Sequence, residues 1–194
     1  MGQAFSLPAP SALRSNAQRV LSTMRFLLWT AAILAALIAL MALAGALLPR
    51  RHRATRRARF RASPDALYAV LAGPPDWRTG IKSFGVLPDR DGRKQWWEED
   101  AHRQKIAYEL VEASPPLRQV VRIADPNLPF GGVWTFEIAP VAAGGSDLRI
   151  TEDGEIYNPI FRFMARFFFG YTATIEGFLR DLGTKFDQQV TIEP

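Results

Sequence analysis

Few side chains in this chain could perform chemistry, and most catalytic classes are missing from it. The 194 residues include no cysteine and two histidines, His52 within a run of arginines and His102 beside an acidic stretch. Without cysteine there is no disulfide framework, thiolate nucleophile or thiolate metal ligand, and neither histidine has a partner at the spacing of a metal site. The sequence also lacks a Ser-His-Asp, Cys-His or phosphate-loop pattern, so we expect no metal and no cofactor.

Three polar residues interrupt the apolar faces of predicted strands and are the candidate functional groups. Side chains alternate between the two faces of a strand, which places Glu152 on one face with Leu148 and Ile150. Tyr108 and Gln119 lie on the apolar faces of two earlier strands. A carboxylate on such a face is costly unless it is paired or protonated. Glu152 is therefore a ligand-orienting group, an acid of raised pKa, a residue at the rim, or the partner of an arginine such as Arg122 or Arg162 in a salt bridge. Tyr108 with Glu152 is the one acid–base pair that could serve catalysis.

Six strand-like segments, each bounded by turn residues, are expected to position these groups. Their short connections are rich in Pro, Asp, Asn and Gly, which is typical of hairpin loops and predicts an antiparallel meander. A further strand is expected around Phe60, before a helix that Ser63 caps and Pro64 begins. The six segments are about Lys82–Leu87, Arg93–Glu99, Arg103–Glu112, Leu117–Ala124, Gly132–Ala139 and Asp147–Tyr157.

The last predicted element is a long helix that Asn158 caps and Pro159 begins. Apolar residues recur along it at spacings of three and four, which is typical of one buried helical face. This face consists of Ile160, Met164, Phe167, Phe168, Tyr171, Ile175, Phe178, Leu179, Leu182 and Phe186. Phe161, Phe163 and Phe169 lie off it with arginines between them, which indicates either an interfacial surface or rings covered by loops.

The order strand, helix, short helix, six strands and long helix resembles the helix-grip fold of the START-like, polyketide cyclase and Bet v 1-like superfamily (SRPBCC). The resemblance covers about residues 55–190, and its marks are residues 63–71 (SPDALYAVL), the turn at Trp77, residues 134–138 (WTFEI) and residues 152–159. It implies an α+β domain in which a curved antiparallel seven-stranded sheet surrounds the C-terminal helix. The superfamily shares no catalytic signature, so the resemblance implies a fold and a hydrophobic ligand cavity rather than a reaction.

In that fold the inward faces of the strands and of the helix line the cavity, and a wide apolar cavity with a few polar groups is typical of small-molecule sites. The candidate ligand-binding residues, each with packed core as the alternative interpretation, are Tyr108, Gln119, Trp134, Phe136, Glu152, Met164, Phe168, Tyr171 and Ile175. Trp96 and Trp97 are adjacent, so they are expected to point to opposite faces of their strand. The three acids at 98–100 indicate a solvated strand end.

A long apolar segment precedes this domain. Twenty-four uncharged residues separate Arg25 from Arg50, and residues 26–48 are almost wholly Ala, Leu and Ile. A bilayer core takes about 20 apolar residues in a helix, so we predict a single transmembrane helix at 25–49 after a flexible tail at 1–24. A cleaved signal peptide is the main alternative, and a buried core helix or a myristoylated Gly2 are the others.

The charge of the chain divides at this segment. Residues 1–61 contain ten arginines and no acid, so the 24 basic and 19 acidic residues of the chain leave 14 basic and 19 acidic residues at 62–194, a net charge of −5. An acidic domain does not suit nucleic acid, whereas the arginines suit an anionic lipid surface. Residues 50–61 are expected to form a basic juxtamembrane segment running into the first strand. Seven arginines follow the span and three precede it, which favours a cytoplasmic C-terminal domain.

These features predict a single-pass protein of the plasma (cytoplasmic) membrane whose domain binds a lipophilic small molecule, a lipid or a polyketide-like compound, between sheet and helix. No protein partner can be named from the sequence. One alternative is an enzyme of the cyclase or dehydratase type that uses Tyr108 and Glu152. The other is a membrane-tethered interaction module without a ligand, and an interior filled by side chains would favour it.

Overall fold

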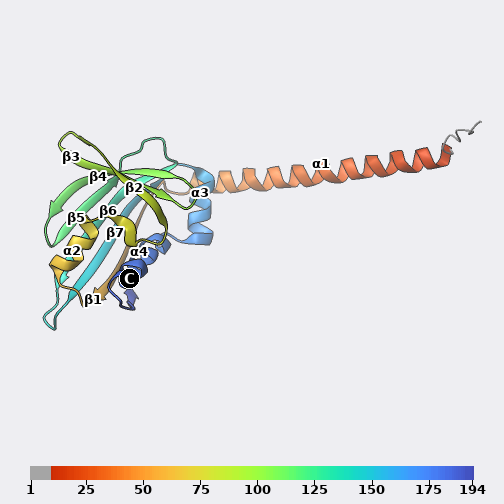
Figure 1. The fold of residues 1–194 in the computed structure, drawn as a ribbon. Coiled ribbons are helices and arrows are strands. Elements are labelled where there is room, and N and C mark those ends of the chain that lie inside the picture. Colours follow the sequence, from red (N-terminus) through yellow and green to blue (C-terminus); the bar gives the residue numbers. More distant parts are fainter. Residues whose placement is uncertain (1–9) are drawn as a thin grey trace, which may run out of the picture.

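The computed structural model describes residues 10–194. A long helix leads away from an α+β domain in which one antiparallel sheet curves around the C-terminal helix (Figure 1). This is the predicted architecture. The elements are α1 (Pro10–Leu47), β1 (Arg51–Phe60), α2 (Pro64–Ala72), η1 (Pro75–Trp77), β2 (Ile81–Arg90), β3 (Arg93–Asp100), β4 (Lys105–Ser114), β5 (Arg118–Ile123), β6 (Phe130–Pro140), β7 (Ser146–Ile156), α3 (Pro159–Met164), the π-helical turn η2 (Ala165–Phe169), α4 (Ala173–Lys185) and β8 (Ile192–Glu193).

The sheet has the strand order β2-β3-β4-β5-β6-β7-β1-β8. Strands β2 to β7 form the predicted meander, and β1 closes it by pairing with β7 along its whole length, from Arg51 opposite Glu155 to Phe60 opposite Ser146. The eighth strand was not predicted. It has two residues, lies beyond the expected end of the domain at 190, and pairs with the free edge of β1.

Most of the basic segment at 50–61 is strand β1, so more of it is strand than the prediction of a juxtamembrane segment running into the first strand expected. The strand begins at Arg51, about five residues before its expected start. Of the seven arginines that follow the apolar segment, five form ion pairs with acids of the domain. The pairs are Arg51–Glu155, Arg53–Asp153, Arg56–Glu176, Arg57–Glu193 and Arg59–Asp147, at 2.7 to 3.0 Å. Because every one of these acids lies more than 80 residues later, the sequence pattern of the segment could not reveal the pairing.

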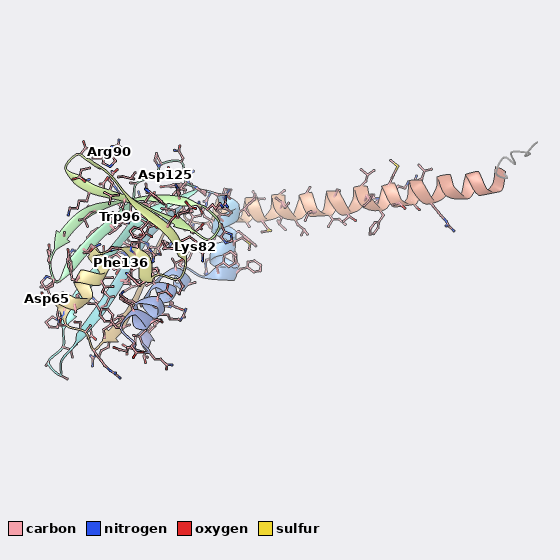
Figure 2. All side chains as sticks on the ribbon, viewed as in Figure 1. Asp65, Lys82, Arg90, Trp96, Asp125 and Phe136 are labelled. Carbon is pink, nitrogen blue, oxygen red and sulfur yellow. The ribbon has the colours of Figure 1, made fainter. Side chains whose placement is uncertain are left out.

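Helices α2 and α4 cover one face of the sheet, and the core lies between them and the strands (Figures 1 and 2). The helix α2 begins as predicted, because the Ser63 hydroxyl accepts a hydrogen bond from the Ala66 amide at 3.3 Å. The core follows the alternation along the strands and consists of Ala54, Ala58, Phe60, Leu67, Val121, Phe136, Ile138, Leu148, Ile150, Ile175, Leu179 and Leu182.

The C-terminal helix is not continuous, which corrects the prediction of one helix over 159–186. Asn158 caps α3 as expected, accepting a hydrogen bond from the Ile160 amide at 2.9 Å. The π-helical turn η2 follows, and Gly170 then takes a left-handed φ of 74° before α4 begins at Ala173. A π turn changes the phase of the helix, so the predicted apolar face does not continue through it. Phe167 and Phe168 are exposed instead of buried.

The helix α1 is anchored to the domain through α3. Gly45 is buried where α3 begins, and a side chain there would collide with the carbonyl group of Pro159. Arg162, only 6% exposed, donates a hydrogen bond through Nη1 to the Leu48 carbonyl oxygen at 2.8 Å. Within α1, Leu21–Leu47 is long and apolar enough to cross a membrane. Helix α1 starts at Pro10, so residues 10–24 of the predicted flexible tail are helical, and residues 1–9 lie outside the described part of the chain.

Candidate functional site

The deeper part of the space between sheet and α4 is filled by aromatic rings. Phe178 of α4 lies 5.4 Å from Phe136 and 5.8 Å from Trp134, measured between ring centroids. It also forms a T-shaped pair with Trp77, with 5.1 Å between the ring centroids. Ile175, one turn earlier on α4, is completely buried. These contacts make this part of the interior a packed core.

The part of the interior nearest α1 is polar. We call it the polar end and define it by His52, Tyr108, Glu152 and Tyr171. Pairing of β1 with β7 sets His52 opposite Gly154, and the imidazole occupies the space that a side chain at Gly154 would need. The same ring stacks on Tyr171, with centroids 4.3 Å apart and planes inclined by 19°. Its Nε2 atom lies 3.9 Å from Glu152 Oε1.

Burial decides the protonation of the groups at the polar end. The Glu152 side chain is 18% exposed, and burial raises its pKa to about 7, against a smaller opposing effect of the Trp134 indole. Burial lowers the pKa of His52, while the Asp153 carboxylate raises it by a smaller amount. A distance of 3.9 Å is too long for a hydrogen bond, and both pKa shifts favour the uncharged forms. We therefore interpret this contact as a carboxyl group beside a neutral imidazole and not as a salt bridge.

The Tyr108 phenol keeps its proton at neutral pH. Burial raises its pKa, and the negative charge of Glu98 raises it further. Tyr108 stacks on Trp96 of the neighbouring strand, with centroids 5.7 Å apart. The phenol can therefore act as a hydrogen-bond donor to a ligand but is a poor general base.

An ion pair that the sequence did not predict lies beside this tyrosine. Glu98 is 7% exposed, accepts a hydrogen bond from Trp96 Nε1 at 3.0 Å, and pairs with Arg78, whose guanidinium lies 5.1 Å from the centre of the Phe178 ring. The prediction that acids 98–100 are solvated is wrong for Glu98. Strand alternation could have found it, because Glu98 shares a face with Trp96. Trp97 points to the other face as predicted, under Lys105 Nζ at 4.2 Å.

Comparison with known proteins was informative only at the level of structure. No protein-family model matches the chain, and no curated protein matches it. A START superfamily protein from Mycobacterium smegmatis is 16% identical with a TM-score of 0.56, over 70% of this chain and 97% of that one. A conserved protein from Geobacillus kaustophilus is 13% identical with a TM-score of 0.56, over 74% of this chain and 100% of that one. Norcoclaurine synthase from Thalictrum flavum is 10% identical with a TM-score of 0.54, over 72% of this chain and 88% of that one.

These likenesses, together with a sheet that curves around α4, establish the architecture. The chain has the helix-grip fold. At such low identity the comparison concerns the fold alone, so the function of the helix-grip domain has to be argued from its own residues.

The structure divides the predicted site residues of the helix-grip domain among the polar end, the packed core and the segment before α4, with Gln119 apart from all three. Tyr108, Glu152 and Tyr171 meet at the polar end, with Trp134 at its boundary, whereas Phe136 and Ile175 belong to the packed core. Gln119 is buried on the same face, and its Oε1 atom has no hydrogen-bond partner within residues 10–194. Two residues lie on the segment before α4: Met164 is half-buried on α3, and Phe168 is 66% exposed, so the prediction that Phe168 lines the interior is wrong. His52, Arg78 and Glu98 were missed.

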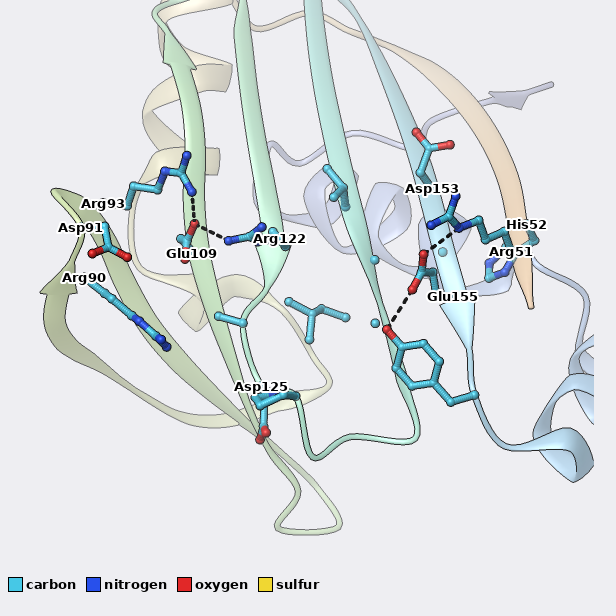
Figure 3. Close-up of a pocket in the computed structure, with 18 residues that line it drawn as sticks. Arg51, His52, Arg90, Asp91, Arg93, Glu109, Arg122, Asp125, Asp153 and Glu155 are labelled. Atoms are coloured by element: carbon cyan, nitrogen blue, oxygen red, sulfur yellow. Dashed lines mark hydrogen bonds and ion pairs between the residues drawn. The ribbon is translucent and has the colours of Figure 1, made fainter. Parts of the chain in front are cut away.

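A hollow of about 690 Å³ opens on the opposite face of the sheet (Figure 3). On one side Arg93 and Arg122 both donate to Glu109, at 2.8 and 2.9 Å. On the other side Glu155 accepts hydrogen bonds from Arg51 at 2.8 Å and from the Tyr157 hydroxyl at 2.9 Å. The hydrogen bond from Arg93 lowers the pKa of Glu109. Walls made of paired charges do not suit a lipophilic ligand, so we do not place the site here.

Proposed function

We propose that the helix-grip domain binds a lipophilic small molecule, a lipid or a polyketide-like compound, at its polar end, and that α1 holds it at a membrane. The observation that carries this proposal is the attachment of α3 to the end of α1. This attachment places the exposed phenylalanines of residues 161–169, the apolar segment of α1 and the polar end of the interior on one side of the domain.

Membrane attachment through α1 is supported by its length and composition. Leu21–Leu47 is long and apolar enough to cross a bilayer, and Phe26, Leu27, Leu28 and Trp29 are largely exposed. Exposed apolar side chains over such a length are stable in hydrocarbon and unstable in water. In lipid the helix satisfies its own backbone hydrogen bonds, so no further protein contact is needed there.

A phenylalanine surface lies beside the end of this helix. We define it by Phe161, Phe167, Phe168 and Phe169, whose exposed fractions lie between 49% and 66%. The contacts of Gly45 and Arg162 fix α3 against the last turns of α1, so this surface lies close to where the apolar segment ends. Exposed aromatic rings with an exposed arginine, Arg166, among them are typical of a segment that lies in the membrane interface.

The segment with the phenylalanine surface also covers the polar end. Tyr171 follows Gly170 directly, two residues after Phe169, and stacks on His52. A ligand dissolved in the bilayer could thus enter the interior beside this segment without crossing water. Tethering raises the local concentration of such molecules around the domain, which replaces their low solubility in water.

Contact between the phenylalanine surface and lipid can be tested on the full chain, because it has no cysteine of its own. Phe168→Cys, labelled with an environment-sensitive fluorophore and reconstituted in liposomes, should show a blue-shifted emission that brominated lipids quench. The control is Ala143→Cys, exposed in the β6–β7 turn at the other end of the sheet. Equal quenching at the two positions would contradict the proposed membrane contact.

The proposed location is the plasma (cytoplasmic) membrane with the domain on the cytoplasmic side. Seven arginines follow the apolar segment and three precede it. Membrane insertion acts on the unfolded chain, before the ion pairs of β1 exist, so all seven contribute to the positive-inside preference. Ala143→Cys should resist a membrane-impermeant maleimide in intact cells and react after permeabilisation. Labelling of intact cells would show the inverted orientation or a secreted domain.

Acid–base catalysis is the second candidate function, and the pKa of Glu152 favours it. A carboxyl group whose pKa is raised to about 7 can exchange a proton near neutral pH, as a general acid or base must. An enzyme of this kind would lose turnover on Glu152→Gln while keeping ligand binding. A binding protein would show no turnover in either form.

A further inference from the structure

The ionisable groups at the polar end are mainly acids, and the cation beside them is already paired. Glu152 reaches it from β7 and His52 from β1, while Glu98 of β3 lies beside Tyr108 of β4. Arg78 is the cation beside Tyr108, and its guanidinium is bound to Glu98, while the buried Arg162 of α3 is directed to the Leu48 carbonyl oxygen. A ligand head group would therefore meet carboxyl oxygens, a phenol and an imidazole.

We infer that the ligand bound here carries a hydrogen-bond-donating head group that is not anionic, an alcohol or an amine on a lipophilic body. This inference rests on the proposed function and specifies the class of ligand. The carboxyl oxygens of Glu152 accept hydrogen bonds from either head group, and a carboxylate form would pair with an ammonium.

An anionic head group would be destabilised at the same place. A carboxylate or phosphate brought next to Glu152 and Glu98 would lose its hydration without gaining a free cation, because Arg78 is held by Glu98. Protonated His52 could compensate for the negative charge, but burial lowers the pKa of the ring and so favours the neutral imidazole. The site should thus exclude free fatty acids and phospholipid head groups.

The test uses the full-length chain in detergent and three probes that differ only in their head group. Stearyl alcohol, stearylamine and stearate are supplied in equal amounts, and one-to-one adducts are counted by native mass spectrometry. We expect adducts of the alcohol or of the amine to exceed those of stearate by about tenfold or more, because binding of stearate would bury its carboxylate without a cation to pair with it. A dominant amine adduct would show that Glu152 acts as a carboxylate, and a dominant alcohol adduct that it acts as a neutral acid.

Two variants connect the preference to Glu152. At pH 8, above the raised pKa of Glu152, Glu152→Gln keeps the shape of the side chain but removes its charge, so it should lower the ratio of amine to stearate adducts. Glu137→Gln, on the outer face of β6 where Glu137 pairs with Arg118 at 2.8 Å, should leave the ratio unchanged. Thermal unfolding of both variants checks that they are folded.

The outcomes separate this inference from the proposed function. Stearate bound as well as the other probes, or a ratio that Glu152→Gln does not change, would overturn the inference while ligand binding stands. If none of the three probes binds, the proposed function itself is overturned and the inference with it.

Discussion

Arg162 on α3 donates a hydrogen bond to the main-chain carbonyl of Leu48, which lies just beyond the end of α1, at 2.8 Å. The last carbonyl groups of a helix have no partner within the helix, so a side chain that reaches one of them stabilises the helix end. Here the side chain comes from an element more than 100 residues later. The contact joins the apolar helix to the segment that covers the polar end.

Replacing Arg162 should loosen this junction. Arg162→Met keeps an apolar stem of similar length but removes the donor, so the half-buried Leu48 carbonyl loses its partner, at a cost of about 1–3 kcal/mol. We expect a lower unfolding temperature in detergent and faster proteolysis between Tyr157 and Thr172. Arg166→Met, at an exposed position of the same segment, is the control and should behave like the unchanged chain. Equal proteolysis of the two variants would show that the hydrogen bond does not hold α3 in place.

The raised pKa of Glu152 predicts that the folded state loses stability as the pH rises. Burial moves this pKa from 4.5 to about 7, so between these values the folded chain holds a proton that the unfolded chain has released. The contribution of Glu152 is complete below pH 4.5 and decreases through pH 7, by up to about 3 kcal/mol. Glu152→Gln should remove this dependence on pH. The unfolding free energy of the variant minus that of the unchanged chain should therefore increase between pH 5 and pH 8. Denaturant unfolding in detergent measures both values.

His52 makes the stability of the folded state depend on pH in the opposite direction, which is why the unchanged chain has to be compared with the Glu152→Gln variant. Its pKa is lowered by burial, so the unfolded chain binds a proton below pH 6.5 that the folded chain does not, and stability rises with pH there. This effect is common to both chains and cancels in their difference. A difference that does not vary with pH would contradict the raised pKa of Glu152.

The buried pair of Arg78 and Glu98 predicts a strongly non-additive pair of substitutions. Arg78→Met leaves the Glu98 carboxylate buried without its cation, which should destabilise the domain by about 3–5 kcal/mol. Glu98→Gln added to Arg78→Met removes the uncompensated charge and should restore much of that loss. A double-mutant cycle of unfolding free energies measures the coupling. Additive effects would mean that solvent, and not Arg78, stabilises Glu98.

Shortening Phe178 should affect stability but not ligand preference. Its ring contacts Phe136, Trp134 and Trp77, so Phe178→Ala would open a cavity in the packed core at a cost of about 3–5 kcal/mol, less where neighbours collapse into the space. The preference among stearyl alcohol, stearylamine and stearate should stay the same because it is set at the polar end. A changed preference would indicate that the head group lies against α4 instead.

Local patterns were sufficient for much of the fold. Alternation along β6 and β7 predicted that Trp134, Phe136, Leu148, Ile150 and Glu152 share the inner face, because the direction of a side chain on a strand depends only on its position along the chain. Ser63 and Asn158 were predicted as helix caps for the same reason, since a cap bonds to residues two or three positions away. Strand alternation could also have predicted that Glu98 is buried on the inner face beside Trp96.

Contacts between distant segments decided the rest. The sequence by itself determined which strand faces are apolar, which residues cap α2 and α3, and that an uncharged stretch precedes the domain. Only the tertiary structure paired the arginines of β1 with acids of β7, laid His52 over Gly154 beside Glu152, and turned Phe168 outward through the π turn before Gly170. The physical reason is that periodicity and capping are properties of neighbouring residues, whereas ion pairing, burial and pKa depend on which strands become neighbours after folding.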